Sequence, residues 1–132
     1  MSNFLLIGLI AVGGAIGAVS RYLLNQKLML LPLPMPYPTF VINIVGCLVL
    51  GLLIPWLFEA SKDAPSFYQA FLTIGILSSF TTFSTFAFEA FQLIHYGRYI
   101  ASICYISTSV LLGLISVLCG IGLSKWFKAM LL

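Results

Sequence analysis

The sequence predicts an all-α integral membrane protein of four transmembrane helices, the third of them broken. The chain of 132 residues is 61% hydrophobic and only 7% charged, with a mean hydropathy of +1.14. A soluble domain carries about 25% charged residues. The apolar runs are long enough to provide the roughly 20 residues that a helix needs to cross a bilayer core. The stretches between them are too short for a soluble domain.

The connections between the apolar runs limit each helix. The four predicted spans are residues 4–24, 39–58, 66–96 and 99–126. The stretch LPLPMPYP has proline at every second position, which favours extended backbone and makes Thr39 a suitable N-cap for the second helix. The most polar stretch, EASKDAPS, precedes the third helix, and a turn around Gly97 precedes the fourth. Residues 1–132 are therefore predicted to form a single four-helix membrane domain.

The third run is longer than a membrane span requires. A helix of its 31 residues would be about 46 Å long at 1.5 Å per residue. The segment GILSSFTT, from Gly75 to Thr82, is the predicted place for a break because it joins a glycine to a dense Ser/Thr run. Broken backbone at membrane depth persists only where protein covers it or a cavity wets it, and its released carbonyls can bind a cation.

The segment SSFTTFSTF consists of three phenylalanines and six hydroxyl residues. If the helix resumes after the break, its periodicity places Thr82, Thr85 and Glu89 on one stripe. Phe83 and Phe86 then lie on the adjacent stripe. A phenyl ring has a positive edge, so rings that present their edges to a path can attract an anion without holding it. Core packing is the alternative for each phenylalanine, but the hydroxyl stripe beside them favours an ion path.

Two polar residues lie inside the first two spans, where polar side chains are costly and often functional. Arg21 is about one turn before the end of the first span, and Asn43 is about one turn after the start of the second. Both ends lie on the same side of the membrane, so we expect similar depth for the two side chains. A cation and an amide there suit an anion. The alternatives are that Arg21 extends to the headgroups and that Asn43 bridges two helices.

Basic residues are divided equally between the two sides of the predicted bundle. One side has Lys62, Lys125 and Lys128, and the other has Arg21, Lys27 and Arg98. The positive-inside rule therefore gives no preferred orientation, and such a chain can insert both ways and pair antiparallel. Four helices form a thin bundle, so we expect oligomerisation. The GxxxG motif of Gly13 and Gly17 marks a close helix contact, either between subunits or within one. The net charge of +3 is too small to indicate a nucleic-acid partner.

The chain shows no pattern that predicts an enzyme. We find no acid–base pair, metal-ligand cluster or nucleophile–base set in the sequence. The three cysteines lie inside predicted spans without the spacing of a metal motif, and buried apolar packing is predicted for each. His95 is predicted to be a polar residue at the membrane interface.

Three short motifs resemble those of the Fluc (CrcB) fluoride channels. They are GGAIGAVSRY, TFVINIVG and TTFSTF, at residues 13–22, 39–46 and 81–86. The resemblance covers the whole chain in order, and the combination is more specific than any one motif. It implies a passive, fluoride-selective route out of the cell, with two pores in an antiparallel, dual-topology dimer. It also implies a multi-pass protein of the plasma membrane, in bacteria the inner membrane.

The resemblance implies roles for particular residues. The fluoride pathway would be formed by Arg21, Asn43, Phe83, Ser84, Thr85 and Phe86. Backbone carbonyls of Ser78 and Thr81 from each subunit would hold a structural Na⁺ at the dimer interface. Family members commonly have Gly-Gly where this chain has Ser78 and Ser79, and serine is strained wherever a positive φ is required. The sequence therefore leaves open the Na⁺ site, and also whether the partner is an identical or a homologous subunit.

Two other functions compete with a fluoride channel. A small dual-topology, proton-coupled multidrug exporter needs an exposed carboxylate in its central cavity, usually from the first helix. Here the first span has no acidic residue, and Glu89 is the one carboxylate within the predicted spans. We expect Glu89 to pair with a hydroxyl or to anchor the break. A non-conducting accessory subunit of a heterodimeric channel is the second alternative.

Overall fold

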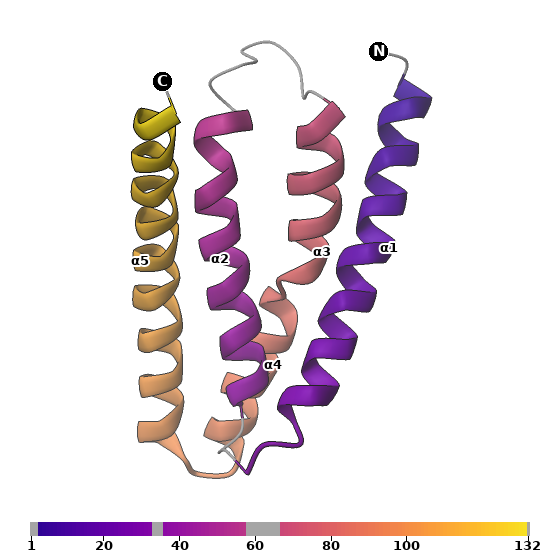
Figure 1. The fold of residues 1–132 in the computed structure, drawn as a ribbon. Helices are drawn as coiled ribbons and strands as arrows, with labels where there is room; N and C mark the ends of the chain where they lie inside the picture. Colours follow the sequence, from indigo (N-terminus) through magenta and orange to yellow (C-terminus); the bar gives the residue numbers. More distant parts are fainter. Residues whose placement is uncertain (1–2, 33–35, 58–66, 132) are drawn as a thin grey trace.

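Four long helices stand side by side in the computed structural model, which describes residues 3–32, 36–57 and 67–131 (Figure 1). Three are continuous: α1 (Asn3–Leu28), α2 (Tyr37–Leu57) and α5 (Tyr99–Leu131). The third helix has three parts, the π-helix η1 (Gln69–Leu77), the short α3 (Ser78–Phe80) and α4 (Phe83–His95). All four are long and apolar enough to cross a membrane. The predicted four-helix membrane protein with a broken third helix is confirmed.

The helix ends differ from the predicted ones by a few residues. Both α1 and α5 continue about one turn further than predicted. Because α2 begins at Tyr37, Thr39 lies inside its first turn and is not the N-cap. Gly97, with a φ of +73°, forms the predicted turn between α4 and α5. The beginning of α1 and the end of α5 lie at the same end of the bundle (Figure 1). Lys62 lies outside the described residues.

Glycines bring two pairs of helices into direct backbone contact. Between α2 and α5, a Cβ atom added at Gly120 would lie 2.5 Å from the carbonyl oxygen of Leu48. Between α1 and η1, a Cβ atom at Gly13 would lie 2.5 Å from the carbonyl oxygen of Phe71, and one at Gly17 would collide with the backbone of η1. The GxxxG motif therefore forms a contact within one subunit, between α1 and the third helix.

The break in the third helix falls at Thr81 and Thr82, the C-terminal edge of the predicted segment. Both residues have extended backbone, with φ and ψ of −78° and 159° at Thr81 and −148° and 112° at Thr82. Gly75 is not at the break. It lies inside η1, where its Cα approaches α1 closely. The glycine thus permits helix contact, and the hydroxyl residues mark the break itself.

Most of the outward surface is apolar, as expected for helices that face lipid or another subunit. A small buried cluster lies where α4 meets α5, formed by Ala90, Leu93 and Tyr105. Many large apolar side chains of α1 and α5 are exposed. Cys104 and Cys119 are exposed as well, so the prediction of buried packing is wrong for these two cysteines.

Candidate functional site

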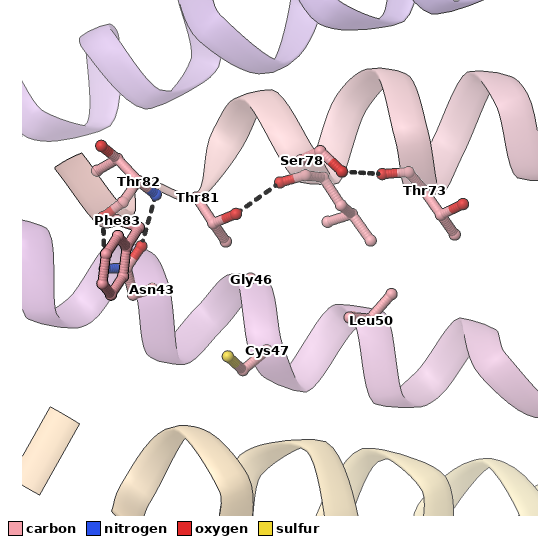
Figure 2. Close-up of a pocket in the computed structure, with 10 residues that line it drawn as sticks. Asn43, Gly46, Cys47, Leu50, Thr73, Ser78, Thr81, Thr82 and Phe83 are labelled. Atoms are coloured by element: carbon pink, nitrogen blue, oxygen red, sulfur yellow. Dashed lines mark hydrogen bonds between the residues drawn. The ribbon is translucent and has the colours of Figure 1, made fainter. Parts of the chain in front are cut away.

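Asn43 of α2 holds the break in the third helix with two hydrogen bonds. The backbone amide of Thr82 donates to Asn43 Oδ1 over 2.9 Å, and Asn43 Nδ2 donates to the carbonyl oxygen of Thr82 over 3.1 Å (Figure 2). One turn further along α2, the missing Cβ of Gly46 leaves room for the methyl group of Thr81. A side chain from another helix thus satisfies the backbone that the break exposes, as a membrane interior demands.

The same hydrogen bonds release two carbonyl groups from helical pairing. In a continuous α-helix, the amides of Thr82 and Thr85 would donate to the carbonyls of Ser78 and Thr81. Here the amide of Thr82 donates to Asn43, and the amide of Thr85 donates to Thr82 Oγ1 over 3.3 Å. The carbonyls of Ser78 and Thr81 therefore lose their α-helical donors. These are the two carbonyls to which the resemblance assigns a cation.

Hydroxyl groups around the break bind backbone and one another. Ser78 Oγ donates to the carbonyl of Thr73, and Thr81 Oγ1 donates to that of Leu77, each over 3.0 Å (Figure 2). Thr82 Oγ1 donates to Thr85 Oγ1 over 2.9 Å. Ser84 and Thr85 are exposed at the beginning of α4. Before the break, the hydroxyls therefore donate hydrogen bonds to backbone carbonyls, and after it they are exposed.

Serine fits the backbone at the position where the family pattern has glycine. Ser78 has a φ of −66° and a ψ of −27°, which is ordinary helical geometry. Among the residues that the structure describes, no residue other than glycine has a positive φ. The strain considered for Ser78 and Ser79 is therefore absent.

The two phenylalanines lie next to each other, as the helical spacing predicted. The ring centroids of Phe83 and Phe86 are 5.8 Å apart, with an interplanar angle of 45°. Phe83 is 80% exposed. Phe86 is half-buried and packs against the ring of Tyr105, with centroids 5.2 Å apart. One ring is therefore fixed by packing, whereas the other projects from the subunit.

Two open hollows meet at the break and share Ser78, Thr81, Thr82 and Phe83. The Asn43 hollow, of about 320 Å³, lies between the break and α2 (Figure 2). The Arg21 hollow, of about 570 Å³, lies between the break and α1 and also includes Ser84. Arg21 and Asn43 therefore face the same short segment. Phe86 and Thr85 line neither hollow.

Arg21 and Asn43 lie deeper along their helices than predicted. Because α1 continues to Leu28, Arg21 is about two turns from the end of its helix. Asn43 is likewise about two turns from the start of α2 at Tyr37. The equal depth that we expected is kept, and both side chains lie level with the break.

Glu89 accepts hydrogen bonds from two hydroxyl groups that the sequence did not single out as its partners. Thr39 Oγ1 donates to Glu89 Oε1 over 2.7 Å, and the hydroxyl of Tyr105 donates to Glu89 Oε2 over 2.8 Å. The expected pairing with a hydroxyl is confirmed. Thr39 stands four residues before Asn43, on the same face of α2, but this spacing along one helix does not point to Glu89.

A transmembrane helix that is broken along its length, with released carbonyls and hollows around the break, is typical of membrane proteins that handle ions. The chain is therefore a multi-pass membrane protein with the kind of broken helix found in ion-handling proteins. A family model described as "CrcB-like protein, Camphor Resistance (CrcB)" matches residues 8–121. The chain belongs to this family, as the three motifs indicated.

Relatives named "Fluoride-specific ion channel FluC" match nearly the whole chain. The protein of Dehalococcoides mccartyi is 43% identical over 121 residues, covering 91% of this chain and 92% of its own. That of Chloroflexus aurantiacus is 41% identical over 128 residues, covering 96% and 98%. That of a Caulobacter species is 35% identical over 118 residues, covering 89% and 92%.

Proposed function

We propose that this chain is a fluoride-selective channel that lets fluoride leave the cell passively. The observation that carries the proposal is the arrangement at the break, where an amide from α2 and a guanidinium from α1 face the interrupted helix that carries the two phenyl rings. The family membership and the names of the relatives support the same function. The protein would act in the plasma membrane, in bacteria the inner membrane.

Fluoride would enter through the two hollows, at the depth of Arg21 and Asn43. Because fluoride is small and strongly hydrated, an apolar constriction must replace nearly all of its water. The exposed hydroxyls of Ser84 and Thr85 can donate hydrogen bonds. Ring edges of the two phenylalanines add weak contacts that do not trap the ion. The pathway is thus a sequence of neutral donors that begins near one fixed positive charge.

The pathway is completed in our proposal by a second copy inserted in the opposite orientation. Phe83 is 80% exposed, and both hollows are open in a single subunit. A partner subunit would cover them and give two pores. Labelling of a cysteine introduced into the 59–65 loop should modify about half of the molecules in intact cells. Labelling of all the molecules, or of none, would mean a single orientation; it would exclude the homodimer and favour an oppositely inserted, homologous partner.

A structural Na⁺ between the two subunits fits the backbone at the break. The carbonyls of Ser78 and Thr81 have lost their α-helical donors, and carbonyl oxygens are the ligands that hard cations bind. Two such groups from each subunit would supply four oxygens. These carbonyls would hold the ion, and their shared coordination would join the two breaks. Asn43 and Thr82 contribute by accepting hydrogen bonds from the amides of Thr82 and Thr85, which would otherwise donate to these carbonyls.

Fluoride efflux from liposomes that contain only this chain tests the function. We expect passive efflux that needs no proton gradient. A proton-coupled exporter would require the gradient, and a non-conducting accessory subunit would give no flux without its partner. The structure argues against the exporter, because the Glu89 carboxylate is bound by Thr39 and Tyr105.

A further inference from the structure

We propose that the Ser78 hydroxyl is a positioning group that holds η1 in its π-helical register. This register fixes the direction in which the break presents its carbonyls, and thereby sets the affinity of this chain for its cation. The link to the cation rests on the proposed function. The structural part stands on the hydrogen bonds of η1 alone.

At the end of η1, the backbone amides can pair in either a π-helical or an α-helical register. A π-helix pairs each amide with the carbonyl five residues earlier, whereas an α-helix pairs it with the carbonyl four residues earlier. The amide of Ser78 donates to the carbonyl of Thr73, which is the π pairing. In the α register, the same amide would donate to Ile74. Isolated π segments are rare and usually short, so η1 needs additional stabilisation.

The side chain of Ser78 provides such stabilisation. Ser78 Oγ donates to the carbonyl of Thr73 over 3.0 Å, so amide and hydroxyl share one acceptor. Serine hydroxyls in α-helices bond instead to carbonyls three or four residues earlier. One turn before, Thr73 Oγ1 donates to the carbonyl of Gln69 over 2.7 Å. The Thr73 bond spans four residues, as in an α-helix, so the five-residue bond of Ser78 is the one that matches the π register.

The packing of α1 favours the same register from outside. A Cβ atom at Gly13 would lie 2.5 Å from the carbonyl oxygen of Phe71 and 3.0 Å from the Cα of Gly75. Gly17 contacts the backbone of Ile76 in the same way. With backbone against backbone, a change of register in η1 would force α1 to move. The surface of α1 and the Ser78 hydroxyl therefore stabilise one arrangement.

The register matters because the two released carbonyls follow directly after η1. The intervening α3 is a single turn, from Ser78 to Phe80. A slip of one residue would rotate the carbonyls of Ser78 and Thr81 about the helix axis. It would also shift the amide of Thr82 relative to Asn43.

Ser78→Ala tests the proposal, with Ser78→Thr as the variant that keeps the hydroxyl. Ser102→Ala is the matched control, since Ser102 is 1% exposed and its hydroxyl donates over 3.0 Å to the carbonyl of Ala90, eight residues past Thr82. Two quantities are measured on the purified protein. They are amide hydrogen exchange in residues 74–80 and the thermal unfolding temperature over a range of Na⁺ concentrations.

Ser78→Ala should accelerate exchange and raise the Na⁺ concentration for half-maximal stabilisation about tenfold, the loss of roughly one hydrogen bond. Ser78→Thr should restore both quantities. Ser102→Ala should lower the unfolding temperature without changing the Na⁺ dependence. Unchanged exchange in Ser78→Ala would overturn the positioning role. Faster exchange with an unchanged Na⁺ midpoint would overturn the link to the cation. If the wild-type protein gains no stability from Na⁺, the proposed cation site itself fails, and exchange still decides the role of Ser78.

Discussion

The bundle consists of two helix pairs. Both are packed through glycines, but one pair has continuous helices and the other contains the broken third helix. α2 packs on α5, and α1 packs on the third helix, in both cases through glycines that let the backbones touch. α2 and α5 are α-helical throughout, although Pro55 stands in the last turn of α2. The third helix is π-helical and then broken, although Thr81 and Thr82 are neither glycine nor proline.

The difference shows what decides where a membrane helix breaks. Each backbone group in the bilayer needs a partner within the protein. Asn43 offers Thr82 both an acceptor and a donor, so the break leaves the backbone of Thr82 satisfied. Pro55 lacks the amide that would pair with the carbonyl of Gly51, yet α2 continues to Leu57, and Lys128 Nζ of α5 donates to the Pro55 carbonyl at this helix end over 3.4 Å. At Thr82, a partner from a neighbouring helix therefore outweighs the local preference of the residue.

Asn43→Asp should have the largest effect, because it removes the donor and leaves a carboxylate oxygen facing the carbonyl of Thr82. The negative charge would also repel fluoride. We expect fluoride efflux to fall about 100-fold and stability to fall by about 2 kcal/mol. Liposome efflux and thermal unfolding measure the two losses. Asn25→Asp adds the same charge where the side-chain amide makes an exposed hydrogen bond to Met29 Sδ over 3.7 Å, and should leave both near wild type. Normal flux in Asn43→Asp would contradict the role of the break.

Phe83→Ile and Phe86→Ile should come next, with loss of most flux and little loss of folding. Isoleucine keeps the bulk and hydrophobicity but removes the ring quadrupole. Phe83 is largely exposed, so its replacement should not change subunit stability, whereas loss of the Phe86–Tyr105 contact should cost about 1 kcal/mol. Phe88→Ile, on the exposed surface of the same helix, is the control for efflux from size-checked protein. Wild-type flux in both variants would make the rings packing residues.

Gly120→Ala, in the α2–α5 pair, should lower stability without lowering flux, and so distinguish this pair from the pair that contains the break. A Cβ atom at Gly120 collides with Leu48 of α2, and overpacking of this kind costs about 1–3 kcal/mol. Gly122, two residues further along α5, has no atom within 4 Å of its added Cβ, so Gly122→Ala should not destabilise the protein. Flux per folded molecule should be unchanged in both. A selective loss of flux in Gly120→Ala would show that the α2–α5 pair also shapes the pathway.

Pro55→Ala should have the smallest effect. It returns an amide to the last turn of α2, where the carbonyl of Gly51 can accept it. We expect the free energy of unfolding to change by less than about 1 kcal/mol and fluoride efflux to stay at the wild-type rate. A large fall in efflux would indicate that the continuous pair depends on its proline, and the contrast with the third helix would weaken.

Much of the fold follows from the sequence because it depends on local composition. Long apolar runs gave the four spans, and the Ser/Thr run with Gly75 gave the region of the break. The exact position of the break was not predictable, because Asn43 sets it from another helix, 39 residues away from Thr82 along the chain. The π-helix was missed for the same reason, since η1 depends on contacts with α1 as well as on its own hydroxyls.

The candidate site was predicted in part. The adjacency of Phe83 and Phe86 follows from helical periodicity, and equal depth for Arg21 and Asn43 follows from their distances to the helix ends. The pairing of Glu89 with Thr39 and Tyr105 joins three helices, and spacing along one helix cannot reveal it. The fluoride roles of the site residues are proposals that the efflux experiments decide.

The break also joins two helix ends of opposite polarity. The stretch of η1 and α3 ends at Phe80, and α4 begins at Phe83. Aligned peptide dipoles give a helix about half a negative charge at its C-terminus and about half a positive charge at its N-terminus. The first end attracts a cation and the second an anion, a few residues apart. Thr82 Oγ1 caps the amide of Thr85, and the amides of Phe83 and Ser84, in the first turn of α4, have no intrahelical acceptor. Neutral peptide groups can thus stabilise a permeating anion without the strong binding that a buried lysine or arginine would impose.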